Sequence, residues 1–135
     1  MNIRRLGRGD EAVVAALATR EPPRTALLED ERTLFFVAFE EGTPVGLVLA
    51  HELPRRHGDE SKLLVYEVDV ADGYRRRGIG KALLAELAAV ARERGIRRGW
   101  VLTDRDNEAA MALYLAAGGV DAHEETMWVF EYTDD

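Results

Sequence analysis

Residues 62–95 read KLLVYEVDVADGYRRRGIGKALLAELAAVARERG, and this stretch decides the fold. Residues 62–70 are rich in β-branched and other apolar side chains, which predicts a strand that stops at the turn signal Ala71-Asp72-Gly73. Residues 80–94 predict a helix, because apolar side chains recur at helical spacing and Gly95 follows where a helix commonly ends. The strand therefore runs through a glycine-containing turn straight into the helix.

The segments around this unit predict an α/β (α+β) domain with a mixed sheet. Asp10 and Asn107 are good N-cap residues for two further helices, and Gly42-Thr43-Pro44 separates a pair of strands. Trp100 and Trp128 fall on expected strands, where we place them in the core, with a dimer contact as the alternative. The expected elements are helices at 10–20, 25–33 and 108–117, and strands at 34–41, 45–53, 99–103 and 125–132.

The composition indicates one soluble domain over residues 1–135, with 47% hydrophobic and 32% charged residues. The formal net charge of −7 argues against nucleic acid as a partner. Cysteine is absent, which excludes disulfides and thiolate ligands, and the three histidines are too scattered for a histidine metal site, so we expect no metal. The first residues lack the apolar core of a signal peptide and no stretch is long enough to cross a bilayer. We therefore expect a cytoplasmic protein with no membrane partner.

The turn between the strand and the helix is a candidate anion site. Gly78 and Gly80 permit positive φ and let several N–H groups point into one concavity at a helix start. The helix dipole and the side chains of Arg75, Arg76 and Arg77 add positive potential. A simple capping turn with arginines in solvent is the alternative.

Spacing separates the phosphate motifs that compete for this turn. The dinucleotide fingerprint needs glycine where Leu83 stands, and the Walker loop needs glycine in place of Arg75 and a hydroxyl in place of Ala82. The remaining pattern, R-x-x-G-x-G over residues 75–80, resembles the acetyl-CoA pyrophosphate loop of the Gcn5-related N-acetyltransferases (GNAT). The run N-x-x-A-x-x-x-Y from Asn107 to Tyr114, followed by two glycines, is similar to a second motif of that family.

Longer segments extend this resemblance. The runs TLFFVAFEEGTPVGLVLAHELPR, VYEVDV and YRRRGIGKALL, together with the ending that contains MWVFEY, are most similar to the aminoglycoside 3-N-acetyltransferase branch. The resemblance implies a mixed, mostly antiparallel sheet of about six to seven strands flanked by about four helices. It also implies that two central strands splay apart.

The resemblance further implies acetyl-CoA as the cofactor, with its pantetheine arm lying in the gap between the splayed strands. The main chain of Val68, Asp69 and Val70 would meet that arm, and the Val70 N–H would be the oxyanion donor. The other implied cofactor-binding residues are Arg75, Arg76, Arg77, Gly78, Ile79, Gly80, Lys81, Asn107 and Tyr114.

Tyr114 is the candidate general acid. It stands two helical turns after Asn107 and therefore on the same side of the helix. A phenol with a pKa of about 10 keeps its proton at neutral pH. The resemblance implies that Tyr114 donates this proton to the departing thiolate, and a packed core tyrosine with a bonded hydroxyl is the alternative.

Glu67 and Asp69 share one face of the strand by alternation and are the candidate acids for the amine. In the aminoglycoside branch the position matching Glu67 is an acid that meets the substrate amine, whereas Asp69 departs from the small residue there, so its role stays open. Merely solvated or ion-paired carboxylates are the alternative. A carboxylate with a pKa of about 4.3 is a weak base toward an alkylammonium. Glu67 therefore either is desolvated or recruits the ammonium while a water relays the proton, and we favour the relay.

Further acids suggest a cationic acceptor. Asp104, Asp106 and Glu108 lie between a strand and a helix, although a solvated loop and helix-dipole compensation explain such acids equally well. The leading hypothesis is an acetyl-CoA-dependent N-acetyltransferase that acts on a small aminoglycoside- or polyamine-like amine. Acetylation of a protein or peptide amine and a non-catalytic coenzyme A-binding module are the alternatives. Homodimers are frequent in the superfamily, so a second copy is a candidate partner.

Overall fold

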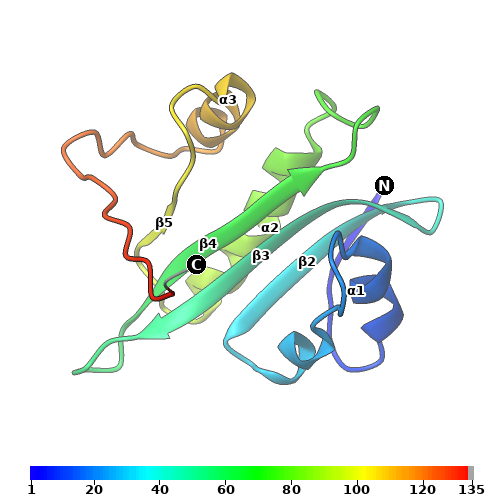
Figure 1. The fold of residues 1–135 in the computed structure, drawn as a ribbon, viewed down its shortest axis with the longest axis horizontal. Helices are drawn as coiled ribbons and strands as arrows, with labels where there is room; N and C mark the ends of the chain where they lie inside the picture. Colours follow the sequence, from blue (N-terminus) through cyan, green and yellow to red (C-terminus); the bar gives the residue numbers. More distant parts are fainter. Residues whose placement is uncertain (134–135) are drawn as a thin grey trace.

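A single five-stranded sheet organises the chain, and the computed structural model describes residues 1–133 of it (Figure 1). The strands lie in the order β1-β2-β3-β4-β5. Neighbouring strands are antiparallel except β4 and β5, which are parallel. The elements are β1 (Asn2–Arg5), α1 (Glu11–Leu17), a 3-10 helix η1 (Thr25–Glu29), β2 (Thr33–Glu40), β3 (Thr43–Pro54), β4 (Ser61–Val70), α2 (Ile79–Glu93), β5 (Gly99–Val101) and α3 (Glu108–Ala116).

The central strands β2 and β3 are covered on both faces, which explains their nearly continuous apolar sequence. On one face, α2 packs its buried stripe of Ile79, Leu83, Leu87 and Ala91 against alternate residues of β2, β3 and β4. On the other face, Val14 of α1 and Leu6 pack against the intervening residues. Each face therefore has its own apolar cluster, and the sheet separates the two clusters.

A β-bulge interrupts the pairing of β3 with β4. Leu49 is paired with Glu67 but the next residue, Ala50, is paired with Val65, so Tyr66 is the extra residue. The bulge reverses the alternation along β4. Val65 and Val68 consequently both pack on the α2 side, although they are three residues apart.

The strands β4 and β5 pair over only three residues, from Leu63 beside Gly99 to Val65 beside Val101. Beyond Val65 the outer edge of β4 has no strand beside it among residues 1–133. The expected splay is therefore present, and it begins at the bulge.

The helix α2 follows the sequence prediction to within a residue at each end. Gly95 adopts a φ of 72° just after the helix. The N–H groups of Gly95 and Ile96 donate to the carbonyls of Arg92 and Ala91 at 3.1 and 2.9 Å, the pattern of a glycine-terminated helix.

Other expectations need correction. The sheet has five strands rather than six or seven, and within residues 1–133 there are three α-helices and one 3-10 helix. β1 escaped the sequence analysis because Asn2–Arg5 carries a single apolar side chain, and its pairing with β2 makes it a strand. The helix expected at 25–33 is only the short η1, and α1 ends at Leu17 because Ala18 is extended.

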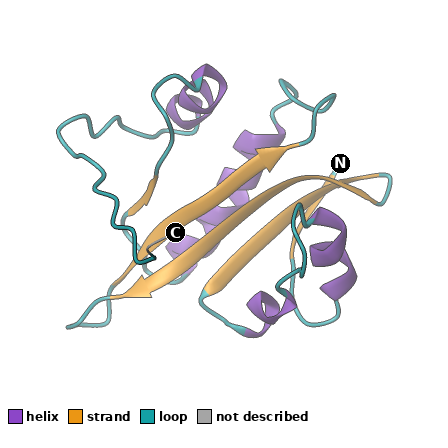
Figure 2. Ribbon diagram, in the orientation of Figure 1, coloured by secondary structure: helices purple, strands orange, loops and turns teal. Residues whose placement is uncertain are grey.

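The strand expected at 125–132 is absent from the described chain, which runs as a loop after α3 (Figure 2). The sequence of that segment has the right propensity, but a strand also needs a paired neighbour. Trp100 and Trp128 are exposed, so their placement in the core was wrong. Of the helices that the structure describes, none has the length and apolar content needed to cross a bilayer.

Asp10 ties β1 to the start of α1, and its charge should stabilise the fold. Its carboxylate lies 2.9 Å from the Arg4 guanidinium and accepts a 2.9 Å hydrogen bond from the Gly7 N–H. The Arg4 hydrogen bond, followed by the Gly7 N–H, lowers the pKa of Asp10. A lowered pKa in the folded state means that this stabilisation is present at neutral pH and is lost as the pH falls through the folded pKa.

We predict that Asp10→Asn lowers the free energy of unfolding by about 1 kcal/mol at neutral pH. The difference from the wild type should shrink as the pH falls from about 3.9, where the unfolded carboxyl takes up its proton, through the lower pKa of the folded state. Chemical denaturation across pH measures this. Asp59→Asn, in the exposed loop between β3 and β4, is the matched control; a loss for Asp10→Asn that is the same at acidic and neutral pH would contradict the prediction.

Candidate active site

The free edge of β4 exposes main-chain groups at two of the three expected positions. The Ala71 N–H donates to the Val45 carbonyl of β3 at 2.8 Å. Because successive N–H groups of a strand point to opposite edges, the Val70 and Val68 N–H groups point away from β3, into the gap beside β5. The main chain of Asp69 instead faces β3, where Asp69 is paired with Leu47. The expected main-chain role therefore fits Val68 and Val70 but not Asp69.

The turn that follows β4 leaves several donors free. Gly78 is the N-cap of α2 with a φ of 78°, and no side chain of the described residues caps the helix. The first main-chain bond of α2 joins the Ala82 N–H to the Gly78 carbonyl at 3.0 Å, so the earlier N–H groups have no helical acceptor in the described chain. No acidic side chain occupies the first turn of this helix. The turn thus fits an anion such as a diphosphate.

The three arginines of the turn have different roles. The Arg75 Nε donates to the Val70 carbonyl at 3.0 Å, and its guanidinium lies 3.2 Å from Asp72 and 3.9 Å from Asp69. Arg75 therefore fastens the turn to the end of β4. Arg77 lies over the Tyr74 ring at 5.2 Å, and Arg76 takes a positive φ of 64°. Arg76, Arg77 and Lys81 are exposed and are the cations that can reach an anion.

The missing side chain of Gly80 serves helix packing. A Cβ atom at this position would lie 3.0 Å from Leu113 Cδ2 on α3. Gly80 is buried, so its missing side chain lets α3 approach the first turn of α2. By contrast, a Cβ at Gly78 would meet open space, and the positive φ is what requires glycine there.

Tyr114 is the next residue after Leu113 in α3, so the packing of Leu113 at Gly80 also places Tyr114 near the start of α2. Burial raises the pKa of Tyr114 above its usual value. Two glycines end the helix behind it: the Gly118 and Gly119 N–H groups donate to Leu115 and Tyr114 carbonyls at 3.1 and 2.8 Å. At the other end Asn107 accepts a 3.0 Å bond from the Ala110 N–H, so its expected cap role is confirmed.

The structure places Glu67 and Asp69 on the face of the sheet opposite α2, where they pair with Leu49 and Leu47. Both side chains are exposed, which favours recruitment of an ammonium over a desolvated base for Glu67. The Asp69 carboxylate lies beside Arg75. Asp69 thus forms an ion pair with an arginine of its own chain.

The remaining acids lie across the gap, in and after the loop that joins β5 to α3 (Figure 1). Asp104, Asp106 and Glu108 are exposed. The guanidinium of Arg105, which lies between these acids in the sequence, donates two hydrogen bonds to the Asp121 carboxylate, at 2.7 and 3.3 Å. This bond ties the loop to the chain after α3 and leaves the three acids facing solvent.

A contact between two rings close to the candidate acids was not expected from the sequence. The rings of Tyr66 and His51 meet edge-on with centroids 5.8 Å apart, and the His51 Nδ1 lies 3.5 Å from the Thr33 hydroxyl. Tyr66 is the bulge residue, and the register shift puts its side chain on the same face of β4 as that of Glu67. The one signal in the sequence was the adjacency of Tyr66 to that acid.

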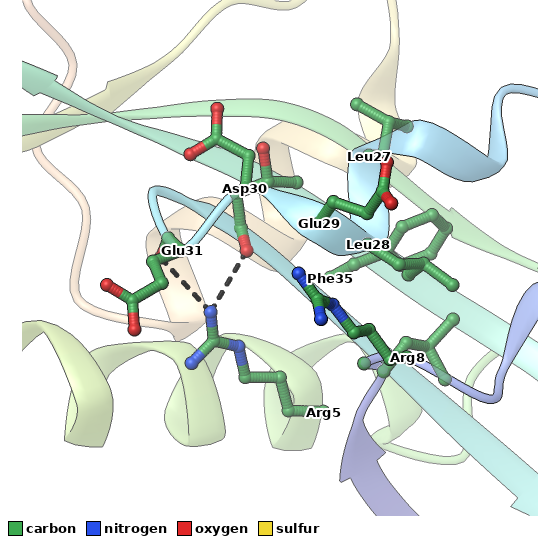
Figure 3. Close-up of a pocket in the computed structure, with 11 residues that line it drawn as sticks. Arg5, Arg8, Leu27, Leu28, Glu29, Asp30, Glu31 and Phe35 are labelled. Atoms are coloured by element: carbon green, nitrogen blue, oxygen red, sulfur yellow. Dashed lines mark hydrogen bonds between the residues drawn. The ribbon is translucent and has the colours of Figure 1, made fainter.

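A hollow of 420 Å³ lies elsewhere, between the end of β1, η1 and the start of β2 (Figure 3). The Arg5 guanidinium crosses it and donates to the Glu31 and Thr33 carbonyls, each at 3.1 Å. None of its lining residues comes from β4, the turn at 75–81 or α3. The hollow therefore has no part in the site described above.

Several solved structures with this fold are described as acetyltransferases. An aminoglycoside acetyltransferase, HMB0005, from an uncultured soil metagenomic sample is 28% identical, with a TM-score of 0.82 over 99% of this chain and 98% of that one. The ribosomal-protein-alanine N-acetyltransferase of Brucella melitensis biovar Abortus 2308 is 26% identical, with a TM-score of 0.81 over 98% and 100%. The aminoglycoside N-acetyltransferase AAC(6')-Iy in complex with CoA shares the fold at 17% identity, with a TM-score of 0.81 over 98% and 100%.

The fold and the strand-turn-helix site thus define an acetyltransferase. The chain belongs to the Acetyltransferase (GNAT) family, whose model matches residues 7–118. Comparison with curated proteins finds no match. The family resemblance is confirmed, and the cofactor of GNAT acetyltransferases is acetyl-CoA. The free N–H groups at the start of α2 and along β4 fit this cofactor.

We predict that Lys81→Glu weakens coenzyme A binding about tenfold, or about 1.4 kcal/mol, because it reverses a charge in the first turn of α2. Calorimetric titration at low ionic strength measures the change. Arg97→Glu makes the same reversal on an exposed residue just beyond the far end of α2 and should leave the affinity nearly unchanged. Equal weakening by the two variants would show that only overall charge matters and that the turn is not the anion site.

Proposed function

We propose that this protein moves an acetyl group from acetyl-CoA to a primary amine of a small cationic acceptor, aminoglycoside- or polyamine-like. The observation that carries this proposal is the placement of Glu67 and Asp69. Both carboxylates are exposed on one face of β4, on the same strand whose Val68 and Val70 direct main-chain groups into the gap. An acceptor with several ammonium groups suits such a face, and the net charge of −7 attracts it over a longer range.

The neighbours in structure support this choice of acceptor. HMB0005 is described as an aminoglycoside acetyltransferase, and it aligns with nearly all of this chain at 28% identity. Another such enzyme from a soil metagenomic sample, meta-AAC0020, was solved in complex with sisomicin. These descriptions concern those proteins, and for this chain they favour a small polyamine over other amines.

The main chain of β4 would do two things in the reaction. Bound acetyl-CoA supplies an acetyl group already activated as a thioester. The Val68 main chain would position the reacting end in the gap, as an added strand is positioned by its neighbour. The Val70 N–H would donate to the carbonyl oxygen as negative charge develops on it, and such a preorganised donor acts most strongly during that step.

Two side chains would take part in the proton transfers of the reaction. Glu67 would hold the ammonium of the acceptor, and a water beside it would carry the proton away, since the exposed site admits water. The Tyr114 hydroxyl would donate the proton that the thiolate needs. Because burial raises the pKa of Tyr114, its hydroxyl remains protonated well into the alkaline range.

A protein N-terminus is the second candidate acceptor. The observation in its favour is the match to the ribosomal-protein-alanine N-acetyltransferase, at 26% identity over 98% of this chain. A peptide would lie along the same face of β4 and would bring one ammonium group rather than several. A panel of aminoglycosides, polyamines and alanine-ended peptides, assayed by thiol release from acetyl-CoA, separates the two acceptors. Turnover restricted to the peptides would overturn the proposal of a small polycation.

We predict that Glu67→Gln raises the KM for the best cationic acceptor about fivefold, because a carboxylate near an ammonium contributes about 1 kcal/mol even in a wet site. Coenzyme A affinity should stay the same. Steady-state kinetics and calorimetry measure the two effects separately. Glu86→Gln, on the exposed side of α2, is the matched control; an unchanged KM in Glu67→Gln would remove Glu67 from the acceptor site.

We predict that Tyr114→Phe lowers kcat about a hundredfold while the Kd of coenzyme A changes little, as expected for loss of a general acid. In the wild type, the alkaline decline of kcat should lie above pH 10, because the pKa of Tyr114 is raised. Tyr132→Phe removes an exposed hydroxyl and serves as control. Full activity in Tyr114→Phe would assign the proton to another donor.

A further inference from the structure

The hollow between the end of β1, η1 and the start of β2 is a second cavity, separate from the site on β4 (Figure 3). Its volume of about 420 Å³ falls within the roughly 300–1,000 Å³ range of small-molecule sites. The hollow lies on the face of the sheet opposite α2, because Leu6 and Phe35 belong to the apolar cluster of that face. In the sheet β3 separates β2 from β4, so a ligand of the hollow would not lie against β4.

The floor of the hollow is apolar. Leu6 and Phe35 are each 5% exposed, and Leu27 and Leu28 of η1 are half-buried beside them. All four side chains line the hollow. A small apolar group that entered would cover what remains exposed of the two η1 leucines, and such burial favours binding.

Two guanidinium groups stand at the hollow without a counter-charge in contact. Arg5 and Arg8 form no ion pair in the part of the chain that the structure describes. The Arg5 Nη2 donates to the Glu31 and Thr33 carbonyls, which fixes the side chain and leaves its other N–H groups for a ligand. Burial, and next the charge of Arg94, lowers the pKa of Arg5. This cation has therefore lost part of its hydration, and an anion beside it would compensate that loss.

Acidic side chains at the end of η1 line the same hollow. Glu29 and Glu31 form no ion pair within residues 1–133. The third acid is already engaged: the Asp30 carboxylate accepts a 2.9 Å hydrogen bond from the Arg32 N–H and lies 3.9 Å from the Arg32 guanidinium. The hollow therefore presents unpaired groups of both signs beside its apolar floor.

We propose that this hollow binds a free α-amino acid with an apolar side chain. Such a ligand carries an ammonium and a carboxylate on one carbon atom, next to an apolar group. The carboxylate would lie at Arg5 and Arg8, whose N–H groups donate charge-assisted hydrogen bonds. The ammonium would face Glu29 and Glu31, and the side chain would lie on the apolar floor.

A ligand with only one charge suits the hollow less well. A simple carboxylate would meet the two unpaired glutamates without an ammonium to offer them. An amine would meet the two arginines in the same way. Repulsion of this kind discriminates between ligands that share the same apolar body.

NMR titration of the isotope-labelled full chain with L-leucine, in the absence of acetyl-CoA, tests the proposal. We expect saturable shifts of the amide signals of Leu6, Leu28 and Phe35, while those of Val68 and Val70 stay in place. Two matched probes each lack one charge of leucine: isocaproate has no ammonium, and isopentylamine has no carboxylate. Each should bind at the hollow at least about tenfold more weakly, as expected when charge-assisted hydrogen bonds are lost.

Arg8→Gln tests the part played by the arginines. Arg8 is exposed, and its side chain makes no hydrogen bond or ion pair to the residues that the structure describes, so the variant should fold normally. It should weaken leucine binding about tenfold. Arg20→Gln, at an exposed arginine outside the hollow, is the matched control and should bind leucine as the wild type does.

Three results would overturn the proposal. The first is the absence of leucine-dependent shifts at Leu6, Leu28 and Phe35. The second is binding of isocaproate or isopentylamine at the hollow that is as tight as that of leucine. The third is equal leucine affinity in Arg8→Gln and the wild type.

Discussion

The separation of β4 from β5 is the constraint on which the rest of the structure depends. Three paired residues hold the two strands together, and then the bulge at Tyr66 turns β4 away. Within residues 1–133, main-chain groups at Val68 and Val70 have no strand beside them, and a main-chain polar group without a partner is costly unless water or a ligand satisfies it. The site exists because the sheet is incomplete at this place.

The turn after β4 also leaves main-chain N–H groups without partners. In the described chain the N–H groups before Ala82 have no helical acceptor, and Arg75 fastens the turn by a hydrogen bond to the Val70 carbonyl and by ion pairs with Asp72 and Asp69. A rigid set of unsatisfied donors at a helix start binds an anion without further rearrangement. Free N–H groups along a strand and at a helix start, in direct succession, suit a ligand with an amide-containing arm and a diphosphate.

The sequence predicted this unit well because its signals are local. The period of residues 62–70, the glycines of the turn and the apolar stripe of α2 each depend on neighbours in the chain, and so do the caps at Asn107 and Gly118. The bulge at Tyr66 could not be predicted, since it is a property of the pairing of β4 with β3. For the same reason the sequence assigned the Asp69 main chain to the gap, and it missed both β1 and the ring contact of Tyr66 with His51.

The part of the chain before β5 and the part after it differ in how much apolar packing fixes them in place. The first part builds two apolar clusters around β2 and β3, with Leu34, Val37, Val48 and Leu83 almost wholly buried. In the last part, α3 has no fully buried residue, and the run at 125–132 is exposed. Tyr114 belongs to this loosely held part. Its position therefore depends on Leu113 against Gly80 and on the link between Arg105 and Asp121.

The most direct test of the central claim is the amide exchange of three consecutive residues, followed by NMR with and without acetyl-CoA. The N–H groups of Val68 and Val70 face the gap, whereas that of Asp69 faces β3. Acetyl-CoA should slow exchange at Val68 and Val70 and change the exchange of Asp69 much less. If saturating acetyl-CoA left Val68 and Val70 exchanging at their free rates, the gap between β4 and β5 would not be the cofactor site.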